Sequence, residues 1–257
     1  MIFISDVHHG LSGLREIPTD KGPLVILGDL INWIDYRDGS GIARDVFGDA
    51  NIDKLITYRK NHDFSMRKDL WKELFSDDPE KKKLQIEEAI GLQYQEVFRE
   101  LANHEVWIIP GNVDSISVME NLAGDNIKLV DTKTIEHEGY KFGFAGGGVP
   151  TPIKARGELT EEEFDQKLNR LSEVDIICTH APPLVDELVT DVITNKIEQG
   201  WSSLLKFIQI NKPIFSLFGD VHQPKATTWL IGETKCINVG YNRASKQYLD
   251  LKDLTSG

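Results

Sequence analysis

Side chains that can bind a metal ion follow five short apolar segments of the sequence. They are Asp6, His8, Asp29, Asn112, His180, Asp220 and His222. Each one alone has an ordinary explanation, because Asp and Asn begin turns and helices and a strand-terminal histidine is often only a hydrogen-bonding partner. Gathered at one sheet edge, they would be costly to bury unless something paired with them. Carboxylate, amide and imidazole ligands without a thiolate suit Mn²⁺, Fe or Zn²⁺, so the set predicts a divalent metal site.

The apolar segments themselves are typical of buried β-strands. They comprise residues 2–4, 24–27, 106–109, 176–178 and 214–218. Short runs that are apolar on both faces and rich in β-branched residues favour a sheet that is covered on both sides. In layered α/β folds, ligands bind at the carboxyl ends of the strands. The sequence therefore predicts an α/β fold with the polar groups at one sheet edge.

Other segments predict the elements around these strands. Thr160 and the three glutamates after it indicate a capped helix start, and the segment from Ile127 to Ala145 is typical of a hairpin that turns at Glu138-Gly139. Residues 236–240 and 247–251 favour further strands, which we expect to close a second sheet.

The segment from Asp38 to His104 differs from the rest, because it is mostly charged and amphipathic. Apolar residues recur in it at helical intervals, and Pro79 is expected to divide it into two helices. We interpret residues 38–104 as a helical hairpin or cap inserted in a single domain of residues 1–257, which roofs the site and selects the substrate.

The order of the short motifs resembles that of the calcineurin-like metallophosphoesterase family. The motifs are Asp6-Val7-His8, Gly28-Asp29, Gly111-Asn112, Thr179-His180 and Gly219-Asp220-Val221-His222. The resemblance implies a four-layer α+β fold, in which a β-sandwich of mixed sheets is flanked by helices and two metals lie at the strand ends. It assigns Asp6, His8 and His222 to one metal, Asn112, His180 and Asp220 to the other, and Asp29 to both.

Two positions depart from the family pattern. Val113 stands where the family commonly has a histidine that assists the leaving oxygen, and valine cannot donate a proton. His9 is our candidate substitute, and Asp114 is the second catalytic candidate. Asp220 stands where the family usually has histidine, which favours Mn²⁺ or Fe over Zn²⁺ because the site becomes richer in oxygen, or weakens that site if the shorter side chain cannot reach.

The composition limits the partners of the chain. The 29 basic and 41 acidic residues give a formal net charge of −12, which disfavours a broad nucleic-acid footprint or a polybasic membrane contact. The N-terminus has no basic and apolar leader pattern, and no apolar run reaches the roughly 20 residues of a membrane helix. The two cysteines lie far apart without metal-binding spacing, so we expect a reducing, cytoplasmic compartment.

The resemblance implies a hydrolase, a metallophosphoesterase that cleaves a phosphate mono- or diester of a small molecule or nucleotide. It implies a binuclear centre, with manganese or iron favoured, that supplies a hydroxide nucleophile. The alternative is a phosphoesterase-like scaffold of weak or no activity that binds a protein partner, and a nuclease is the less favoured enzyme. The oligomeric state and the natural substrate stay open.

Overall fold

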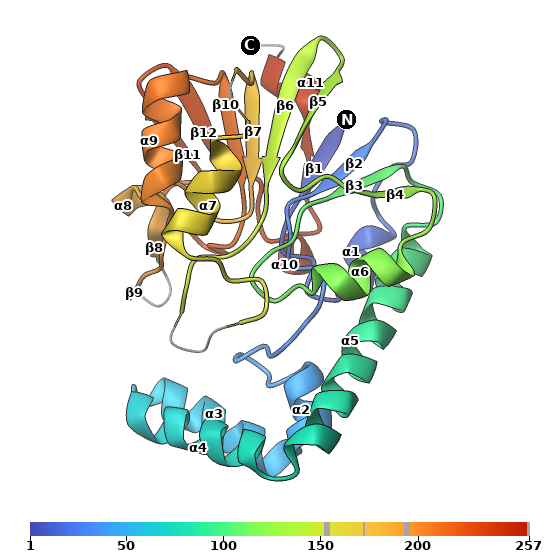
Figure 1. The fold of residues 1–257 in the computed structure, drawn as a ribbon, viewed down its shortest axis with the longest axis vertical. Coiled ribbons are helices and arrows are strands. Elements are labelled where there is room, and N and C mark those ends of the chain that lie inside the picture. Colours follow the sequence, from blue (N-terminus) through green and yellow to red (C-terminus); the bar gives the residue numbers. More distant parts are fainter. Residues whose placement is uncertain (152–154, 172, 193–195, 256–257) are drawn as a thin grey trace. The chain divides into compact units, whose positions relative to one another are not determined.

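The computed structural model describes residues 1–151, 155–171, 173–192 and 196–255, which belong to two compact units (Figure 1). The larger unit comprises Met1–Leu30 and Val97–Gly257, and the helical unit comprises Ile31–Glu96. None of the described helices is long and apolar enough to cross a membrane.

The first sheet of the larger unit has the strand order β13-β1-β2-β3-β4. The strands are β1 (Ile2–Ile4), β2 (Leu24–Ile26), β3 (Val106–Ile108), β4 (Ile127–Leu129) and β13 (Leu249–Asp250). Strands β1 to β4 are parallel, and β13 is antiparallel to β1. The expectation that residues 247–251 join the second sheet is therefore wrong. They cover the outer edge of β1, where Asp250 pairs with Ile2.

The second sheet has the order β11-β12-β10-β7-β6-β5. The strands are β5 (Lys133–His137), β6 (Tyr140–Ala145), β7 (Ile176–Thr179), β10 (Phe215–Phe218), β11 (Thr228–Ile231) and β12 (Thr234–Asn238). The four inner strands are parallel, and β5 and β11 are antiparallel edges. A separate short ladder joins β8 (Thr190–Asp191) to β9 (Lys196–Ile197). The predicted hairpin with its turn at Glu138-Gly139 is confirmed for β5 and β6. The start of the same segment was wrongly included, because Ile127–Leu129 form β4 of the first sheet.

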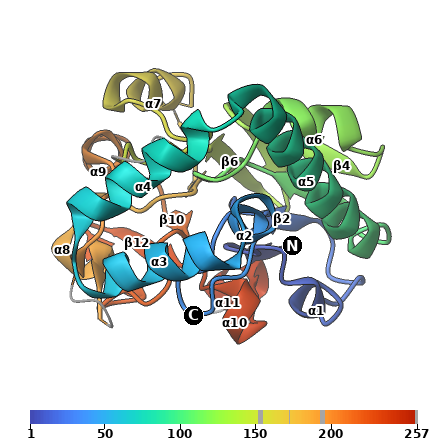
Figure 2. The same cartoon turned by 90° about the horizontal axis from the view of Figure 1, so that it is seen from below.

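Two mixed sheets flanked by helices make up the larger unit, which confirms the predicted fold class. Its helices are α1 (Leu11–Leu14), α6 (Ile116–Leu122), α7 (Glu161–Leu168), α8 (Asp186–Val189), α9 (Ser202–Asn211), α10 (Asn242–Ser245) and α11 (Leu251–Thr255). Helix α7 begins at Thr160 with a complete capping box, as predicted. Helices α7 and α9 lie side by side on the outer face of the second sheet (Figures 1 and 2), where Phe164 stacks on Trp201.

One apolar core joins the two sheets. Phe3 and Val25 from the first sheet pack in the same cluster as Phe142, Phe144 and Leu217 from the second. The five strands that precede the predicted ligands are thereby divided between two sheets, with β1, β2 and β3 in one and β7 and β10 in the other. The simpler expectation of a single sheet edge is wrong. The carboxyl ends still meet, because the core aligns the two sheets face to face.

The helical unit contains α2 (Ile42–Phe47), α3 (Asp49–Lys60), α4 (Phe64–Ser76) and most of α5 (Pro79–Glu100), with α3 and α4 side by side (Figures 1 and 2). The predicted break at Pro79 is confirmed, since proline is the first residue of α5. The prediction of only two helices missed α2 and α3. Trp33 and Trp71 stack with ring centroids 6.2 Å apart and pack beside Phe47 inside this unit. The assignment of residues 38–104 as a cap inserted in one domain stays a prediction.

Candidate metal centre

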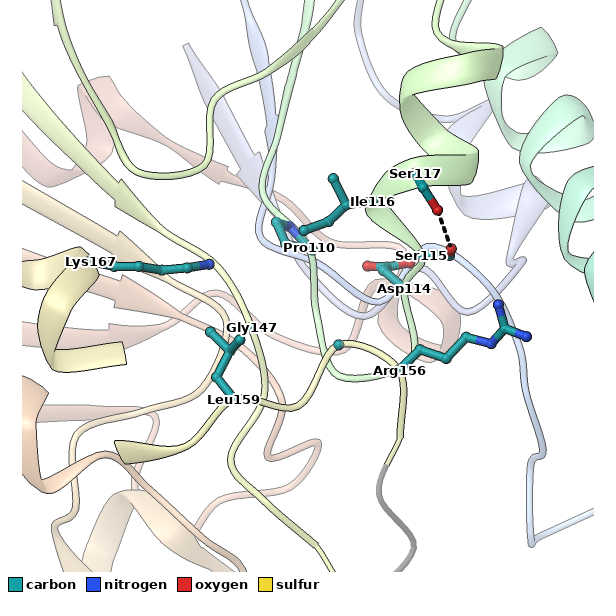
Figure 3. Close-up of a pocket in the computed structure, with 10 residues that line it drawn as sticks. Pro110, Asp114, Ser115, Ile116, Ser117, Gly147, Arg156, Leu159 and Lys167 are labelled. Atoms are coloured by element: carbon teal, nitrogen blue, oxygen red, sulfur yellow. Dashed lines mark hydrogen bonds between the residues drawn. The ribbon is translucent and has the colours of Figure 1, made fainter. Parts of the chain in front are cut away.

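A cavity of about 320 Å³ lies beside the loop that follows β3 (Figure 3). Asp114, Ser115, Arg156 and Lys167 are among the residues that line it. Lys167 Nζ already pairs with Asp131 Oδ2 at 2.7 Å. Of the predicted site residues, only Asp114 lines this cavity, so the cavity adjoins the candidate metal ligands and does not contain them.

Hydrogen bonds between loops bring neighbouring strand ends together within each sheet. Asp6 N donates to Gly28 O at 3.1 Å, and His8 N donates to Asp29 O at 2.8 Å. Gly219 N donates to His180 O at 2.8 Å, which joins the loops after β7 and β10. The predicted ligands are therefore held by backbone contacts that do not require a metal.

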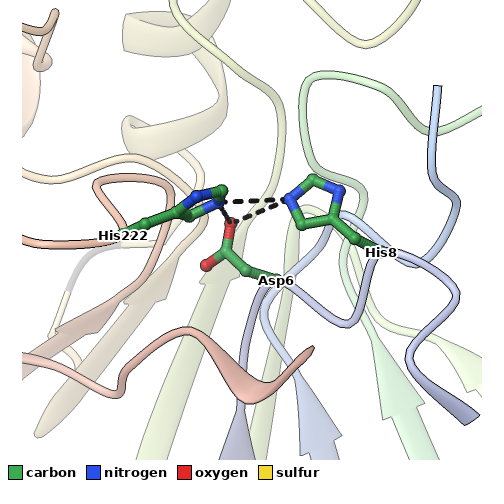
Figure 4. A group of neighbouring side chains, drawn as sticks. All are labelled: Asp6, His8 and His222. Atoms are coloured by element: carbon green, nitrogen blue, oxygen red, sulfur yellow. Dashed lines mark hydrogen bonds and ion pairs between the residues drawn. The ribbon is translucent and has the colours of Figure 1, made fainter. Parts of the chain in front are cut away.

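The first group of candidate ligands consists of Asp6, His8 and His222 (Figure 4). Asp6 Oδ1 lies 3.3 Å from His222 Nε2 and 3.7 Å from His8 Nε2. The two Nε2 atoms are 3.2 Å apart. At this distance one Nε2–H can donate to the other Nε2, or both lone pairs can face a cation between them. The three side chains therefore form a candidate site for a cation.

Asp29 lies between this group and a second one. Its Oδ2 is 3.5 Å from His8 Nε2, and its Oδ1 is 3.5 Å from His180 Nε2. Asp6, Asp29 and His180 also have one ligand atom each within 4.8 Å of the others. A carboxylate with an imidazole on each side is a candidate for a metal ligand.

His180 is oriented by the backbone. Its Nδ1 lies 2.7 Å from Leu27 O, a contact in which only a protonated Nδ1 can donate. The remaining ring nitrogen, Nε2, then points its lone pair at the second group. Asp220 Oδ1 lies 3.5 Å from the same Nε2, so the shorter carboxylate does reach this group.

Three atoms of the predicted ligands are buried without a hydrogen bond among the described residues. They are Asp6 Oδ1, Asn112 Oδ1 and His180 Nε2. Such atoms cost free energy when they have no partner, and native structures contain few of them. Two carbonyl-type oxygens and an imidazole nitrogen, with no thiolate beside them, fit a divalent cation of the Mn²⁺, Fe or Zn²⁺ kind.

The pKa values of Asp29, Asp6 and His180 also indicate that positive charge is favourable at this site. Burial raises the pKa of Asp29 to about 6. Burial would also raise the pKa of Asp6, but the adjacent imidazoles of His222 and His8 hold it well below its usual value. Burial would lower the pKa of His180, but the carboxylates of Asp29 and Asp220 raise it well above its usual value. Without a cation, protons balance these carboxylates, and a divalent cation would take their place.

The backbone at the candidate ligands is strained. Asp6, His8, Asp29 and Asp220 have φ angles of +56°, +41°, +57° and +64°. These are left-handed conformations that cost roughly 1–3 kcal/mol each for a residue with a side chain. Strain of this kind persists where the surrounding structure fixes the backbone, and it collects at functional sites. The turns aim the side chains at a common point at the expense of local stability.

Gly111 shows why a glycine precedes Asn112. A Cβ atom at Gly111 would lie 2.1 Å from Asp29 Oδ1 and 2.5 Å from Asp29 N. Real Cβ atoms do not approach backbone atoms this closely, so any larger residue would displace Asp29 or the loop. The glycine therefore lets the loop after β3 pack directly on the loop after β2.

Asp114 is 1% exposed and holds these two loops together. Its Oδ2 accepts hydrogen bonds from Asp29 N at 2.7 Å and Gly111 N at 2.8 Å, and its Oδ1 accepts one from Leu30 N at 3.1 Å. The carboxylate thereby positions Asp29. The ligand groups described above do not include Asp114 or His9, and the catalytic roles of both stay predictions.

Tyr241 is a residue at the centre that the sequence did not indicate. Its ring stacks on the imidazole of His222, with centroids 3.9 Å apart and an angle of 6° between the planes. It follows β12 and a glycine, in a segment that predicted only a strand and its end. No spacing or motif in the sequence marks it.

Comparisons with known proteins support the fold alone. No protein-family model matches the sequence, and no curated protein sequence does. One crystal structure is similar over 98% of this chain and 95% of its own, with 18% identity and a TM-score of 0.64. Another is a "putative 5′-nucleotidase from Staphylococcus aureus in complex with alpha-ketoglutarate", with 11% identity and a TM-score of 0.39 over 93% of this chain and 48% of that one. Fold and site together define a mixed α/β protein with a candidate Asp/His metal centre.

Addition of Mn²⁺ is expected to stabilise the protein. A cation that binds only the folded state at 100 times its Kd adds about 2.7 kcal/mol, which corresponds to a rise in Tm of roughly 5–10 °C for a chain of this size. The measurement is thermal unfolding with and without Mn²⁺, with NaCl of equal ionic strength as the control and EDTA to reverse the effect. An unchanged Tm at millimolar Mn²⁺ would contradict a metal site in these residues.

Proposed function

We propose that this protein is a metal-dependent phosphoesterase of the calcineurin-like kind, which hydrolyses a phosphate mono- or diester at a centre of two divalent cations. The observation that carries the proposal is that Asp6, His8 and His222, and likewise Asp6, Asp29 and His180, each bring one ligand atom within 4.8 Å of the others in their group. The order of the sequence motifs supports the same assignment. Mn²⁺ or Fe is the metal that we favour, with Zn²⁺ as the alternative.

Two ligand sets are proposed. Asp6, His8 and His222 would hold one cation, and Asn112, His180 and Asp220 the other, with Asp29 shared. Cations bound in this way lower the pKa of water and neutralise charge that develops on a phosphoryl group.

The chain's own residues prepare this site. Leu27 O fixes which nitrogen of His180 carries the proton. Asp114 holds the backbone of Asp29 and Gly111, so the shared carboxylate is positioned before any substrate arrives. Val113 N donates to Asp29 Oδ1 at 3.1 Å and fixes the rotation of this carboxylate. Such preorganisation reduces the free energy spent on rearrangement during the reaction.

The substrate that we propose is a small phosphorylated molecule or a nucleotide. The net charge of −12 disfavours a long nucleic-acid partner, whereas bound cations would reverse the charge at the centre itself. Because Val113 cannot donate a proton, esters whose leaving group needs little protonation should be the better substrates. His9 remains the proposed substitute donor.

The second candidate is a scaffold that keeps the fold without efficient catalysis. Val113 is the observation that favours it, because the side chain offers no acid for the leaving group. Asp220 does not favour it, since its carboxylate reaches His180. We prefer the enzyme, because a scaffold has no need to gather so many buried ligand atoms.

The test is hydrolysis of bis(p-nitrophenyl) phosphate and p-nitrophenyl phosphate by the full chain after removal of metal and after reloading with Mn²⁺. We expect release of p-nitrophenol only from the reloaded protein, with about two Mn²⁺ bound per chain. EDTA should stop the reaction, and excess Mn²⁺ should restore it. A reloaded chain that binds two metals but cleaves neither ester would favour the scaffold, and a chain that binds none would refute the metal centre.

A further inference from the structure

We propose that Tyr241 is a positioning residue for the first ligand group, because its ring fixes the imidazole plane of His222 so that Nε2 points at Asp6 and His8. The proposal rests on the metal centre proposed above. It concerns a residue that contacts candidate ligands and is not itself a ligand or a catalytic group.

His222 is the ligand of this group that most needs support. Its side chain is 35% exposed, against 13% for His8 and 1% for Asp6. The χ2 torsion of histidine has no sharp minima, so its rotamer alone does not fix the direction of the ring. An exposed imidazole without a neighbour would turn Nε2 away from Asp6 Oδ1.

The ring of Tyr241 supplies that neighbour. It lies parallel to the His222 imidazole at 3.9 Å between centroids, and it meets the His8 ring edge-on at 5.8 Å and 72°. Tyr241 itself is 5% exposed, so it is held by the protein and not by solvent. One buried ring therefore contacts both imidazoles of the group and restricts the rotation of the more exposed one.

Backbone contacts fix Tyr241 relative to Asp6 and His8. Tyr241 forms an isolated parallel bridge with Ser5, and Asn242 N donates to Ser5 O at 3.0 Å. Arg243 N donates to Asp6 O at 3.2 Å, and Arg243 Nη1 donates to His8 O at 3.2 Å. Residues 241–243 thus run alongside the loop that carries Asp6 and His8, and each of them contacts it. Because the tyrosine ring is fixed in this way, its stacking contact also restricts the orientation of the His222 imidazole.

The expected consequence of losing the ring is weaker binding of one cation. Groups that orient a metal ligand typically change metal affinity by about 10- to 100-fold when they are removed. The effect should be confined to the cation held by Asp6, His8 and His222. The second cation should lose less affinity, because its ligands Asn112 and His180 belong to other loops and only Asp220 shares the loop of His222.

The experiment compares Tyr241→Phe, which keeps the ring, with Tyr241→Leu, which keeps only apolar volume. Mn²⁺ affinity and stoichiometry are measured by calorimetry on the full chain. We expect the Phe variant to bind like wild type and the Leu variant to lose about 10-fold or more in affinity at one of two sites. Tyr140→Leu is the matched control, because Tyr140 begins β6 next to the hairpin turn and is absent from both ligand groups.

A second readout needs no metal. The aromatic ring current of Tyr241 should shift the NMR signal of the His222 Cε1 proton in the metal-free protein, and the shift should persist in Tyr241→Phe and disappear in Tyr241→Leu. A Leu variant with an unchanged His222 signal would overturn the role of Tyr241, as would a Phe variant that loses the metal as Leu does.

The two proposals fail in different ways. Wild type that binds no Mn²⁺ would refute the proposed metal centre, and the NMR comparison would then decide by itself whether Tyr241 orients His222. Wild type that binds two Mn²⁺ while the Leu variant binds them equally well would overturn the role of Tyr241 and leave the proposed function intact.

Discussion

Replacement of Asp29 by asparagine is expected to abolish the proposed phosphoester hydrolysis while the protein stays folded. Asparagine keeps the size of the side chain and an oxygen that can accept from Val113 N, but it lacks the charge that Asp29 presents to His8 on one side and His180 on the other. Metal-derived stabilisation of a phosphoryl transfer is worth several kcal/mol, so kcat/KM should fall by about 10³-fold or more.

The measurements are the hydrolysis of bis(p-nitrophenyl) phosphate and the number of Mn²⁺ bound per chain. Asp125→Asn is the control, because it makes the same chemical change at an exposed position. We expect the control to match wild type in both measurements. Hydrolysis by Asp29→Asn within tenfold of wild type would show that the shared carboxylate is not part of the active centre.

Replacement of Gly28 by alanine is expected to be among the most destabilising single substitutions in the larger unit. Gly28 has a φ of +95°, and a Cβ there would lie 2.6 Å from Gly111 N and 2.7 Å from His180 Nδ1. Left-handed strain and the overlap with backbone and a buried ring together cost about 2–6 kcal/mol. Displacement of His180 should also weaken Mn²⁺ binding.

Gly139→Ala separates the two causes. Gly139 has a φ of +82°, but a Cβ there would meet nothing within 4 Å. This variant should lose only the conformational part, about 1–2 kcal/mol, and bind Mn²⁺ normally. Urea unfolding of wild type and both variants gives the comparison. Equal losses of stability at the two positions would mean that close approach to Gly111 and His180 carries no cost.

The sequence predicted best what local interactions determine. The central strands are visible because they are apolar on both faces, and α7 is visible because Thr160 and Glu163 cap it within one turn. The pairing of Asp250 with Ile2 could not be predicted, because the partners lie at opposite ends of the chain and no pattern within 247–251 indicates which sheet edge is open. Helices α2 and α3 were not predicted, because charged residues interrupt the helical spacing of their apolar residues.

The same distinction applies to the site. Asp6, His8 and His222 were proposed as one group from motif order, and the structure brings them together although His8 and His222 are 214 residues apart in sequence. The three hydrogen bonds to Asp114 were not predictable, because they depend on the directions of backbone N–H groups in two loops. Tyr241 was missed for a similar reason, since its role follows from the position of its ring and not from its neighbours in sequence.

The separation of His222 from Asp6 and His8 in sequence has a consequence for the order of folding. The first ligand group joins residues 214 positions apart, so it can form only after His222 has been synthesised and has reached His8 and Asp6. Contacts between such distant segments form late, because the entropy of closing the long loop must first be overcome. A cation bound by this group would therefore slow unfolding far more than it would speed folding. Its main effect would be on the kinetic stability of the folded protein.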